Sequence, residues 1–186
     1  ERQFRAAGAD QAGDAKDLAA PERERDVADV AAVIEVFHLK HGRANRGLGL
    51  EFAKQYAADG CNVIATCRRP AEAAELRRVG VTIEALDTST ASSIEALAKK
   101  LADESIDVMI CNAGVYGPRS DGLTDMPTED FDLVMRTNVL GPLRLTLAFA
   151  HNVARARGAM VFLSSRMGSI GTMSSSSGIA YRASKA

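Results

Sequence analysis

Short apolar runs alternate with stretches of helical periodicity from about residue 44 to the end of the chain. The apolar runs predict strands at 62–67, 81–86, 106–111 and 159–163, and the periodic stretches predict helices at 47–58, 71–78, 92–102 and 128–157. Because the strands are apolar throughout rather than at every second residue, they predict a parallel sheet covered by helices on both faces. The fold class expected from this pattern is α/β, a doubly wound parallel sheet.

The longest predicted helix, 128–157, contains a start signal and a breaker. Thr128 stands before Glu129 and Asp130, which is typical of an N-cap followed by acidic residues in the first turn. Pro142 lies in the helix interior, where it cannot donate a backbone hydrogen bond. We therefore expect a capped helix with a kink, or the local loss of one hydrogen bond, at this proline.

The N-terminal segment does not continue the regular pattern. Residues 1–32 are rich in Ala, Asp, Glu and Arg with weak apolar periodicity, which predicts a solvated helix or a disordered tail. Residues 32–39 predict a first strand through their β-branched content, although a helix fits them as well.

Composition places the chain among ordinary globular proteins. Its 186 residues are 46% hydrophobic and 25% charged, which allows a sizeable core and excludes disordered, collagen-like and coiled-coil classes. A formal net charge of −1 gives no electrostatic reason to expect binding to nucleic acid or to an anionic membrane. No stretch approaches the roughly 20 apolar residues of a membrane span, and the charged, Ala-rich start predicts no signal peptide.

Three cysteines, Cys61, Cys67 and Cys111, lie inside apolar runs. Their odd number and apolar surroundings favour reduced core thiols over a set of disulfides. The sequence therefore predicts a cytoplasmic protein.

Candidate binding residues lie where ligands bind in doubly wound sheets, beyond the carboxyl ends of the strands. The glycines of 44–49 open the first regular helix and would let a phosphate approach its N-terminus, although such turns are often purely structural. Arg68 and Arg69 follow the strand 62–67. Arginine there suits the 2′-phosphate of a dinucleotide, and two solvated arginines in a turn are an equal alternative.

Further polar residues follow the later strands. Asp87 and Thr88, taken alone, best fit a helix N-cap, and a plain turn is the alternative for residues 112–114. Ser164 and Ser165 follow the last strand, where a hydroxyl could meet a polarised carbonyl or simply form a turn.

Tyr181 and Lys185 are spaced i, i+4 and share one face if their segment is helical. A free tyrosine has a pKa near ~10, and a neighbouring ammonium lowers that pKa. Tyr181 is therefore a candidate general acid or base, although this pair of residues alone is common by chance.

Taken in order, these residues resemble the short-chain dehydrogenase/reductase family over residues 44–186. The matching pieces are Asn45-Arg46-Gly47-Leu48-Gly49, Asp87, Asn112-Ala113-Gly114, Asn138, Ser164-Ser165 and Tyr181-x-x-x-Lys185. Each piece is weak alone, and their shared order on the expected elements is specific. The runs 164–170 and 181–185 are most similar to C-factor-like and sniffer-type carbonyl reductases. The resemblance implies a Rossmann-like domain that is truncated at its C-terminus.

The resemblance also implies an oxidoreductase that reduces a carbonyl to an alcohol with NADP(H), or runs the reverse reaction, by hydride transfer. Tyr181 would exchange a proton with the substrate oxygen, and Ser165 would hydrogen-bond that oxygen. Lys185 would lower the Tyr181 pKa and hold the nicotinamide ribose. Asn138 would hold a water that relays protons between Lys185 and solvent.

The implied cofactor-binding residues are Asn45, Arg46, Gly47, Leu48, Gly49, Arg68, Asp87, Thr88, Asn112, Ala113, Gly114, Tyr181 and Lys185. Asp87 would accept from the adenine amine, and Arg46 with Arg68 would select NADP(H) over NAD(H). No metal is expected. The implied partners are a small carbonyl or alcohol substrate and further copies of the chain, in a homodimer or homotetramer formed through the helix 128–157.

The choice of Ser165 rests on a length difference. Many family members place the serine about three residues nearer the tyrosine, where this chain has Gly168. The branch with an extra Gly/Ser-rich loop, here 174–178, keeps the serine at the strand end. Ser164, the strand neighbour, would point to the opposite side, so Ser165 is preferred.

The chain departs from the family at both ends. Where the family has its first phosphate-loop glycine, this chain has Arg43, or Gly42 with one residue inserted, and residues 37–41 are too polar for a central strand. We hypothesise that residues 1–43 are not native family sequence, for example a wrong reading frame joined near Ala44, which resequencing of the locus tests. The chain also ends just after Lys185, so we expect it to bind cofactor poorly and to turn over little.

Two other functions stay open. The same fold could serve as a non-catalytic interaction or signalling protein, or the chain could be an inactive fragment of a damaged gene. The set of Asn138, Ser165, Tyr181 and Lys185 argues against the first, because a binding role does not require all four. Arg43 and the unusual first strand favour the second.

Overall fold

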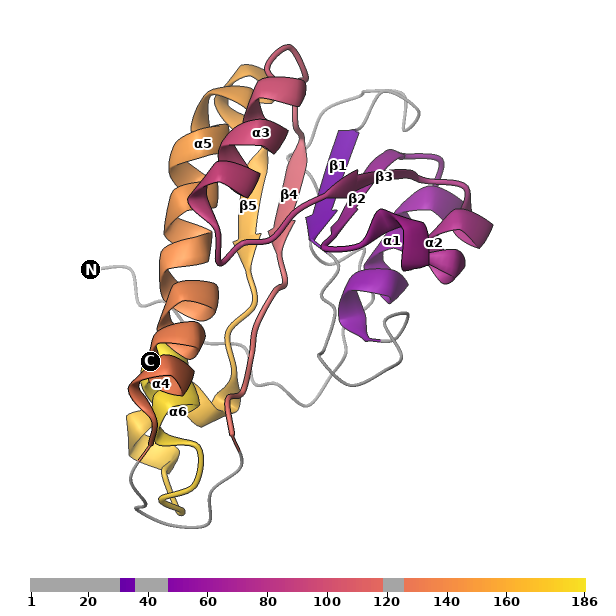
Figure 1. The fold of residues 1–186 in the computed structure, drawn as a ribbon. Coiled ribbons are helices and arrows are strands. Elements are labelled where there is room, and N and C mark those ends of the chain that lie inside the picture. Colours follow the sequence, from indigo (N-terminus) through magenta and orange to yellow (C-terminus); the bar gives the residue numbers. More distant parts are fainter. Residues whose placement is uncertain (1–30, 36–46, 119–125) are drawn as a thin grey trace, which may run out of the picture.

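The computed structural model describes residues 31–35, 47–118 and 126–186. Its core is a five-stranded parallel sheet with the strand order β3-β2-β1-β4-β5 (Figure 1). The strands are β1 (Ala31–Glu35), β2 (Asn62–Cys67), β3 (Thr82–Ala85), β4 (Val108–Cys111) and β5 (Ala159–Phe162). The doubly wound parallel sheet expected from the apolar runs is confirmed, and the four later strands lie within the predicted ranges.

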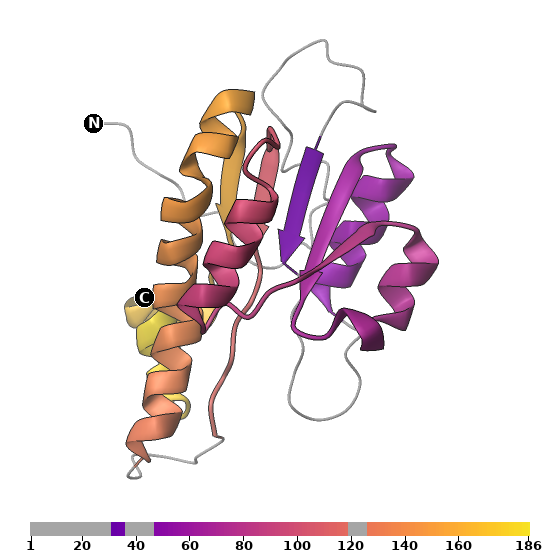
Figure 2. The same ribbon diagram turned by 45° about the horizontal axis from the view of Figure 1, so that its top comes forward.

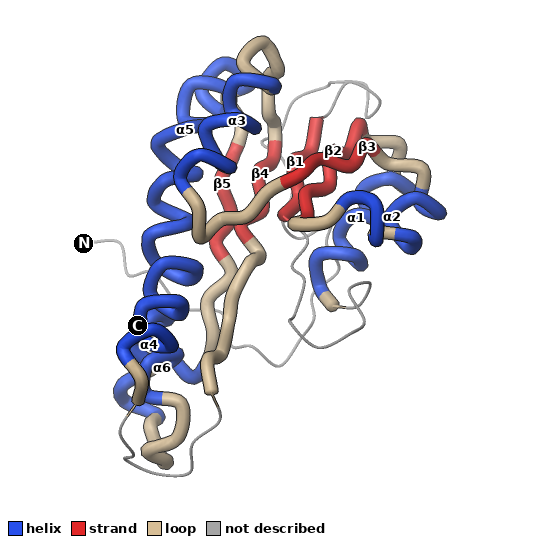
Figure 3. The backbone as a smooth tube through the Cα atoms, in the orientation of Figure 1, coloured by secondary structure: helices blue, strands red, loops and turns tan. Residues whose placement is uncertain are grey.

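Helices cover both faces of the sheet. One face carries α1 (Leu48–Ala58), a 3-10 turn (Pro70–Glu72) and α2 (Ala74–Val79). The other carries α3 (Ala91–Lys100) and α5 (Gly141–Ala156), which pack side by side (Figure 2). Beyond the carboxyl ends of the strands lie α4 (Thr128–Met135) and α6 (Ile179–Lys185), which contact each other (Figure 3). Two short 3-10 turns, Arg166–Gly168 and Ile170–Thr172, connect β5 to α6.

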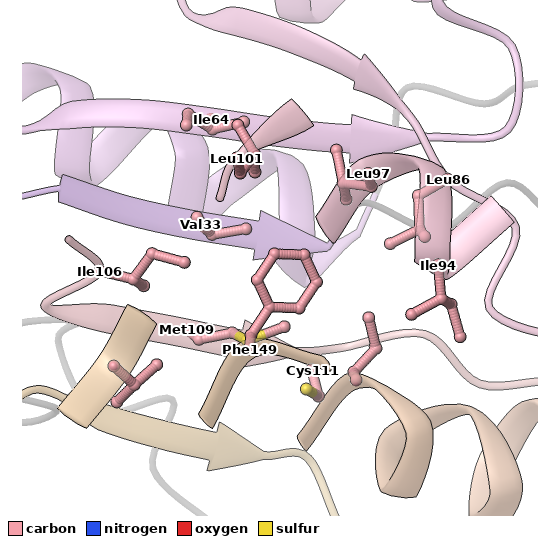
Figure 4. Packing of buried hydrophobic residues seen from close by; sticks show 12 residues of the cluster. Val33, Ile64, Leu86, Ile94, Leu97, Leu101, Ile106, Met109, Cys111 and Phe149 are labelled. Atoms are coloured by element: carbon pink, nitrogen blue, oxygen red, sulfur yellow. The ribbon is translucent and has the colours of Figure 1, made fainter. Parts of the chain in front are cut away.

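Each face has its own apolar cluster. On the α1 side, Leu50 and Tyr56 pack over buried residues of β1, β2 and β4. On the α3 and α5 side, Phe149 is fully buried and points toward the sheet, in the cluster that includes Val33 and Met109 (Figure 4). A sheet buried on both faces explains why its strands are apolar without alternation.

The central strand comes from the irregular N-terminal part of the sequence. Val33 of β1 pairs with Ile64 of β2 on one side and with Met109 of β4 on the other. At the strand start, the Ala31 N–H donates to the buried Asp107 carboxylate at 3.1 Å. The expected strand at 32–39 therefore exists at 31–35, and the helical alternative is wrong for those five residues. The remaining residues of 1–46, which include Asn45 and Arg46, lie outside the described residues, and the origin of 1–43 stays a prediction.

The long helix is continuous but not uniform. Between α4 and α5 the backbone forms a wider π-helical turn at Arg136–Leu140, directly before Pro142. The expected irregularity is thus confirmed, as an added residue in the turn rather than a kink. The predicted cap at Thr128 is wrong, because Pro127 occupies the N-cap and Thr128 is already helical. Proline fits there because the first helical N–H groups have no helical partner to lose.

The three cysteines are free thiols, and Cys67 and Cys111 are buried. Burial raises the pKa of the Cys67 thiol, which keeps it protonated. Within the described ranges, no helix combines the length and the apolar character that crossing a membrane requires.

The central position of β1 predicts the effect of a charge at Val33, which is 3% exposed. Val33→Asp should destabilise the domain by about 3 kcal/mol or more, because it buries an unpaired carboxylate in the sheet. Chemical denaturation measures this, with the exposed Thr82→Asp in the edge strand β3 as the matched control. An unchanged unfolding midpoint for Val33→Asp would place residues 31–35 outside the folded domain.

Candidate active site

The predicted site residues that the structure describes lie at the carboxyl-terminal end of the sheet, beyond the last residues of the strands. Gly47 opens α1 on the chain that follows β1, Arg68 follows β2, and Asp87 lies two residues after β3. The segments that leave β4 and β5 stay together, since the Leu163 N–H donates to the Cys111 carbonyl at 3.2 Å (Figure 3). These two segments lead to α4 and α6, so the candidate residues from both halves of the chain converge at this end of the sheet.

Helix α1 begins at a glycine and has no side-chain cap among the described residues. Gly47 is the N-cap with a φ of +112°, a conformation that favours glycine, and no side chain hydrogen-bonds to the cap. A Cβ placed on Gly47 would meet no atom within 4 Å. Leu48 is exposed and Gly49 is buried in the first turn. Among the described residues, no side chain caps the first N–H groups of this 11-residue helix, an arrangement that fits a phosphate.

The two arginines after β2 are not equivalent. Arg69 pairs with Glu72 at 3.2 Å, three residues along the chain. Arg68 is also exposed and lies next to the strand end. Arg68 directly follows the last residue of β2, so it lies one residue nearer than Arg69 to the carboxyl end of the strand.

Asp87 and Thr88 form a tight turn rather than a helix cap. The Asp87 carboxylate accepts hydrogen bonds from the Ser89 N–H at 3.0 Å and from the Ser89 hydroxyl at 2.6 Å. The N-cap of α3 is Thr90, so the helix-cap alternative for this pair is wrong. Thr88 is buried under α5, where a Cβ on Gly141 would come within 3.0 Å of the Thr88 carbonyl oxygen.

Asn138 lies in the π-helical turn and is 6% exposed, so its carboxamide needs partners inside the protein. Its Oδ1 accepts from the Val115 N–H at 2.8 Å, and its Nδ2 donates to the Val115 carbonyl at 2.9 Å. The second Nδ2 hydrogen goes to the Ser184 hydroxyl at 2.8 Å. One side chain thus joins the segment after β4 to helix α6.

The turn at 112–114 lies against the same group. A Cβ on Gly114 would lie 3.5 Å from Asn138 Oδ1 and 3.7 Å from Lys185 Nζ. Glycine therefore leaves a small space that faces both polar groups. Three residues that the sequence marked independently, Gly114, Asn138 and Lys185, are brought together here.

Tyr181 and Lys185 both lie in α6, so the expected helical spacing of this pair is confirmed. The Lys185 ammonium donates to the Leu163 carbonyl at the end of β5, at 2.7 Å. Ser164 donates its hydroxyl to the Lys185 carbonyl at 3.2 Å. Both contacts hold the C-terminal end of α6 against the end of β5.

Ser165 caps the short 3-10 turn that follows β5. Its oxygen accepts from the Met167 N–H at 3.1 Å, which leaves the O–H hydrogen of Ser165 available to a ligand. Gly168 has no hydroxyl and packs tightly against the Lys185 carbonyl, where a Cβ would overlap. The structure therefore makes Ser165 a usable donor and leaves no room for a larger residue at Gly168.

Tyr116 is an aromatic neighbour of Tyr181 that the sequence did not predict. The rings of Tyr116 and Tyr181 lie with centroids 5.0 Å apart at an angle of 31°. Gly178, with a φ of +65°, makes room for the Tyr116 hydroxyl, which a Cβ would overlap. Val115 and Ser184 were missed as well, because Val115 acts through its main chain. The position of Ser184 next to Lys185 was the one available hint.

Comparison with known proteins agrees with this arrangement. A sequence model described as short chain dehydrogenase matches residues 43–186. The chain is 31% identical over 134 residues to the NADPH-dependent 1-acyldihydroxyacetone phosphate reductase of Schizosaccharomyces pombe. That match covers 70% of this chain and 45% of the relative, so the chain spans about half the length of this curated protein.

Two solved structures have the same fold. One is a Burkholderia multivorans protein assigned to the short-chain dehydrogenases/reductases, with bound NADP (TM-score 0.71, 30% identity, covering 84% of this chain and 67% of that one). The other is a carbonyl reductase from Pseudomonas aeruginosa PAO1 (TM-score 0.69, 30% identity, 83% and 71%).

Proposed function

Because this chain belongs to the short-chain dehydrogenase family, we propose that the whole protein reduces a carbonyl to an alcohol with NADP(H), or catalyses the reverse oxidation. The convergence of Gly114, Asn138 and Lys185 beside the helix that contains Tyr181 carries this proposal. It combines a phenol, an ammonium and a buried amide at the edge where doubly wound sheets bind dinucleotides. The N-terminus of α1, which no described side chain caps, fits the pyrophosphate of that cofactor.

The cofactor, when bound, supplies the hydride. Tyr181 donates the proton that the substrate oxygen gains, and takes it back in the oxidative direction. Lys185 lies one helical turn after Tyr181 in α6, and it holds the ribose hydroxyls. Ser165 donates its free O–H to the substrate oxygen.

Asn138 serves the proton path through its main chain. Both Nδ2 hydrogens are used within the protein, by Val115 and Ser184. Pro142 has no N–H, so it cannot give the Asn138 carbonyl its usual donor four residues along the helix. We assign this carbonyl to the water that links Lys185 with solvent.

NADP(H) is the proposed cofactor rather than NAD(H). Three observations support this proposal: Arg68 directly follows β2, one relative is named as NADPH-dependent, and one structural neighbour contains NADP. Asp87, Thr88 and the turn at 112–114 complete the proposed cofactor site. Arg46 is the second basic residue expected to contact the 2′-phosphate, and it lies outside the described residues.

Three finer assignments belong to this proposal. The free thiols support the proposed cytoplasmic location, and the similarity of the run 164–170 supports the proposed kinship with the C-factor-like and sniffer-type carbonyl reductases. A second copy covers the apolar face formed by the π-helical turn and α5, where Val139, Leu143 and Leu147 are 41%, 53% and 74% exposed. The mass of the protein in solution tests the homodimer or homotetramer that this face would form.

Tyr181→Phe tests the reaction. In the chain extended by its own flanking coding sequence, we expect NADPH oxidation by a test ketone to fall roughly 10²- to 10⁴-fold, because the proton donor is gone. NADPH affinity should stay the same, since the ring remains.

Tyr56→Phe, a buried tyrosine of α1, is the control and should keep the rate. NADPH binding without turnover in the parent protein would favour the non-catalytic signalling protein, and neither binding nor turnover would favour an inactive fragment.

Arg68→Ala tests the cofactor preference. The ratio of kcat/KM for NADPH to that for NADH should fall roughly 10- to 100-fold, because a charged hydrogen bond to the 2′-phosphate is lost. Arg69→Ala is the matched control, since its guanidinium pairs with Glu72, and it should leave the ratio unchanged. Equal ratios in both variants would remove Arg68 from the cofactor site.

A further inference from the structure

One hydroxyl beside the site has no part in the proposed chemistry. Ser184 lies in α6 between Tyr181 and Lys185 and is half-buried against the π-helical turn. Its Oγ accepts from Asn138 Nδ2 at 2.8 Å and donates to the Tyr181 carbonyl at 2.8 Å. The hydroxyl therefore uses one acceptor and one donor function at once, and connects two residues of the proposed site.

The Asn138 side chain makes other hydrogen bonds besides the one to Ser184. Two hydrogen bonds to the main chain of Val115 hold the carboxamide in a plane set by the segment after β4. Val115 lies four residues after β4, in the segment that leaves the carboxyl end of this strand. Through its two hydrogen bonds, Ser184 links Asn138 to the carbonyl of Tyr181, the residue that we propose as proton donor.

Helix α6 is held in place by contacts on two sides. On the β5 side, it is held by the Lys185 ammonium on the Leu163 carbonyl and by Ser164 on the Lys185 carbonyl. On the side of the π-helical turn, Ser184 makes the hydrogen bond.

The proposed reaction affects the contacts on these two sides of α6 differently. The proposed function requires Lys185 to turn toward the ribose hydroxyls, which weakens its bond to Leu163. The proposed reaction gives Ser184 no other partner, so it does not require the hydrogen bond between Ser184 and Asn138 to break.

We propose that Ser184 is a positioning residue, which holds α6 at a fixed rotation against Asn138 so that Tyr181 and Lys185 keep facing the substrate. This inference rests on the proposed function, and it assigns Ser184 no contact with substrate or cofactor. Loss of the hydroxyl leaves an Asn138 N–H buried without a partner, which is unfavourable. We expect α6 to turn or loosen so that this N–H can find another acceptor or water.

Ser184→Thr and Ser184→Val form a matched pair, because threonine and valine have the same shape and only threonine retains the hydroxyl. In the 186-residue chain, NMR of the Asn138 side-chain amide reports the contact itself. We expect the Asn138 N–H that donates to residue 184 to exchange slowly with solvent in wild type and in Ser184→Thr. It should exchange fast in Ser184→Val.

In the chain extended by its flanking coding sequence, kcat with NADPH should be about three- to tenfold lower for Ser184→Val than for Ser184→Thr. Threonine should restore the wild-type rate, a rescue that a steric effect would not produce. Ser184→Ala replaces the valine variant if that variant does not fold, and it should show the same loss.

Equal kcat values for the hydroxyl and non-hydroxyl variants, in a protein that turns over NADPH, would overturn the positioning role and leave the proposed function intact. If the wild-type protein neither binds nor oxidises NADPH, the proposed function fails. The amide exchange then still decides whether Ser184 holds α6, because that readout needs no cofactor. Unchanged exchange in Ser184→Val would overturn the contact.

Discussion

The side chain of Asn138 is buried where the segment after β4, the π-helical turn and helix α6 meet. A carboxamide removed from water must satisfy its donors and acceptor within the protein, and here the main chain of Val115 and the hydroxyl of Ser184 do so. Those partners can meet only if the sheet, the long helix and the last helix adopt one relative placement. A polar group that is costly to bury thus fixes the geometry of the whole edge.

The small residues around this edge follow from the same placement. Gly114 leaves space beside Asn138 and Lys185, and Gly141 lets α5 approach the Thr88 carbonyl within the distance that a side chain would block. Pro142 forces the helix to give up a regular turn, and the π-helical insertion directly before it turns Asn138 inward. The wider helical turn and the close contacts at glycine both allow three backbone segments to lie close around the Asn138 side chain.

Much of the fold could be predicted because the sheet is buried on both faces. The run Asn62–Cys67 begins and ends where its strand does, and every residue after Asn62 is buried, because a doubly covered strand selects for apolar character on both faces. The start of the sheet was less readable. Ala31–Glu35 is short and Ala-rich, and the polar residues after it masked its position in the centre. The cap at Thr128 failed because proline at the N-cap fits equally well, and composition does not separate the two.

The site was predictable only in part, for a similar reason. Tyr181 and Lys185 have a spacing that a helix turns into one face, and Gly47 marks the backbone conformation that only glycine adopts easily. Val115 contributes its main chain, which leaves no trace in a residue pattern. Tyr116 reaches Tyr181 across a gap of 65 residues, a contact that requires the fold to be known.

The central claim is that the ends of the strands and helix α6 together form a dinucleotide site. Crystals of the chain with its flanking coding sequence, grown with NADP⁺, test it through one distance, from Lys185 Nζ to the nicotinamide ribose hydroxyls. The account predicts hydrogen-bond distance there, with the 2′-phosphate of the adenosine at Arg68 and Ser184 still bonded to Asn138. NADP⁺ bound elsewhere, or Lys185 directed only at the Leu163 carbonyl in the complex, would contradict it.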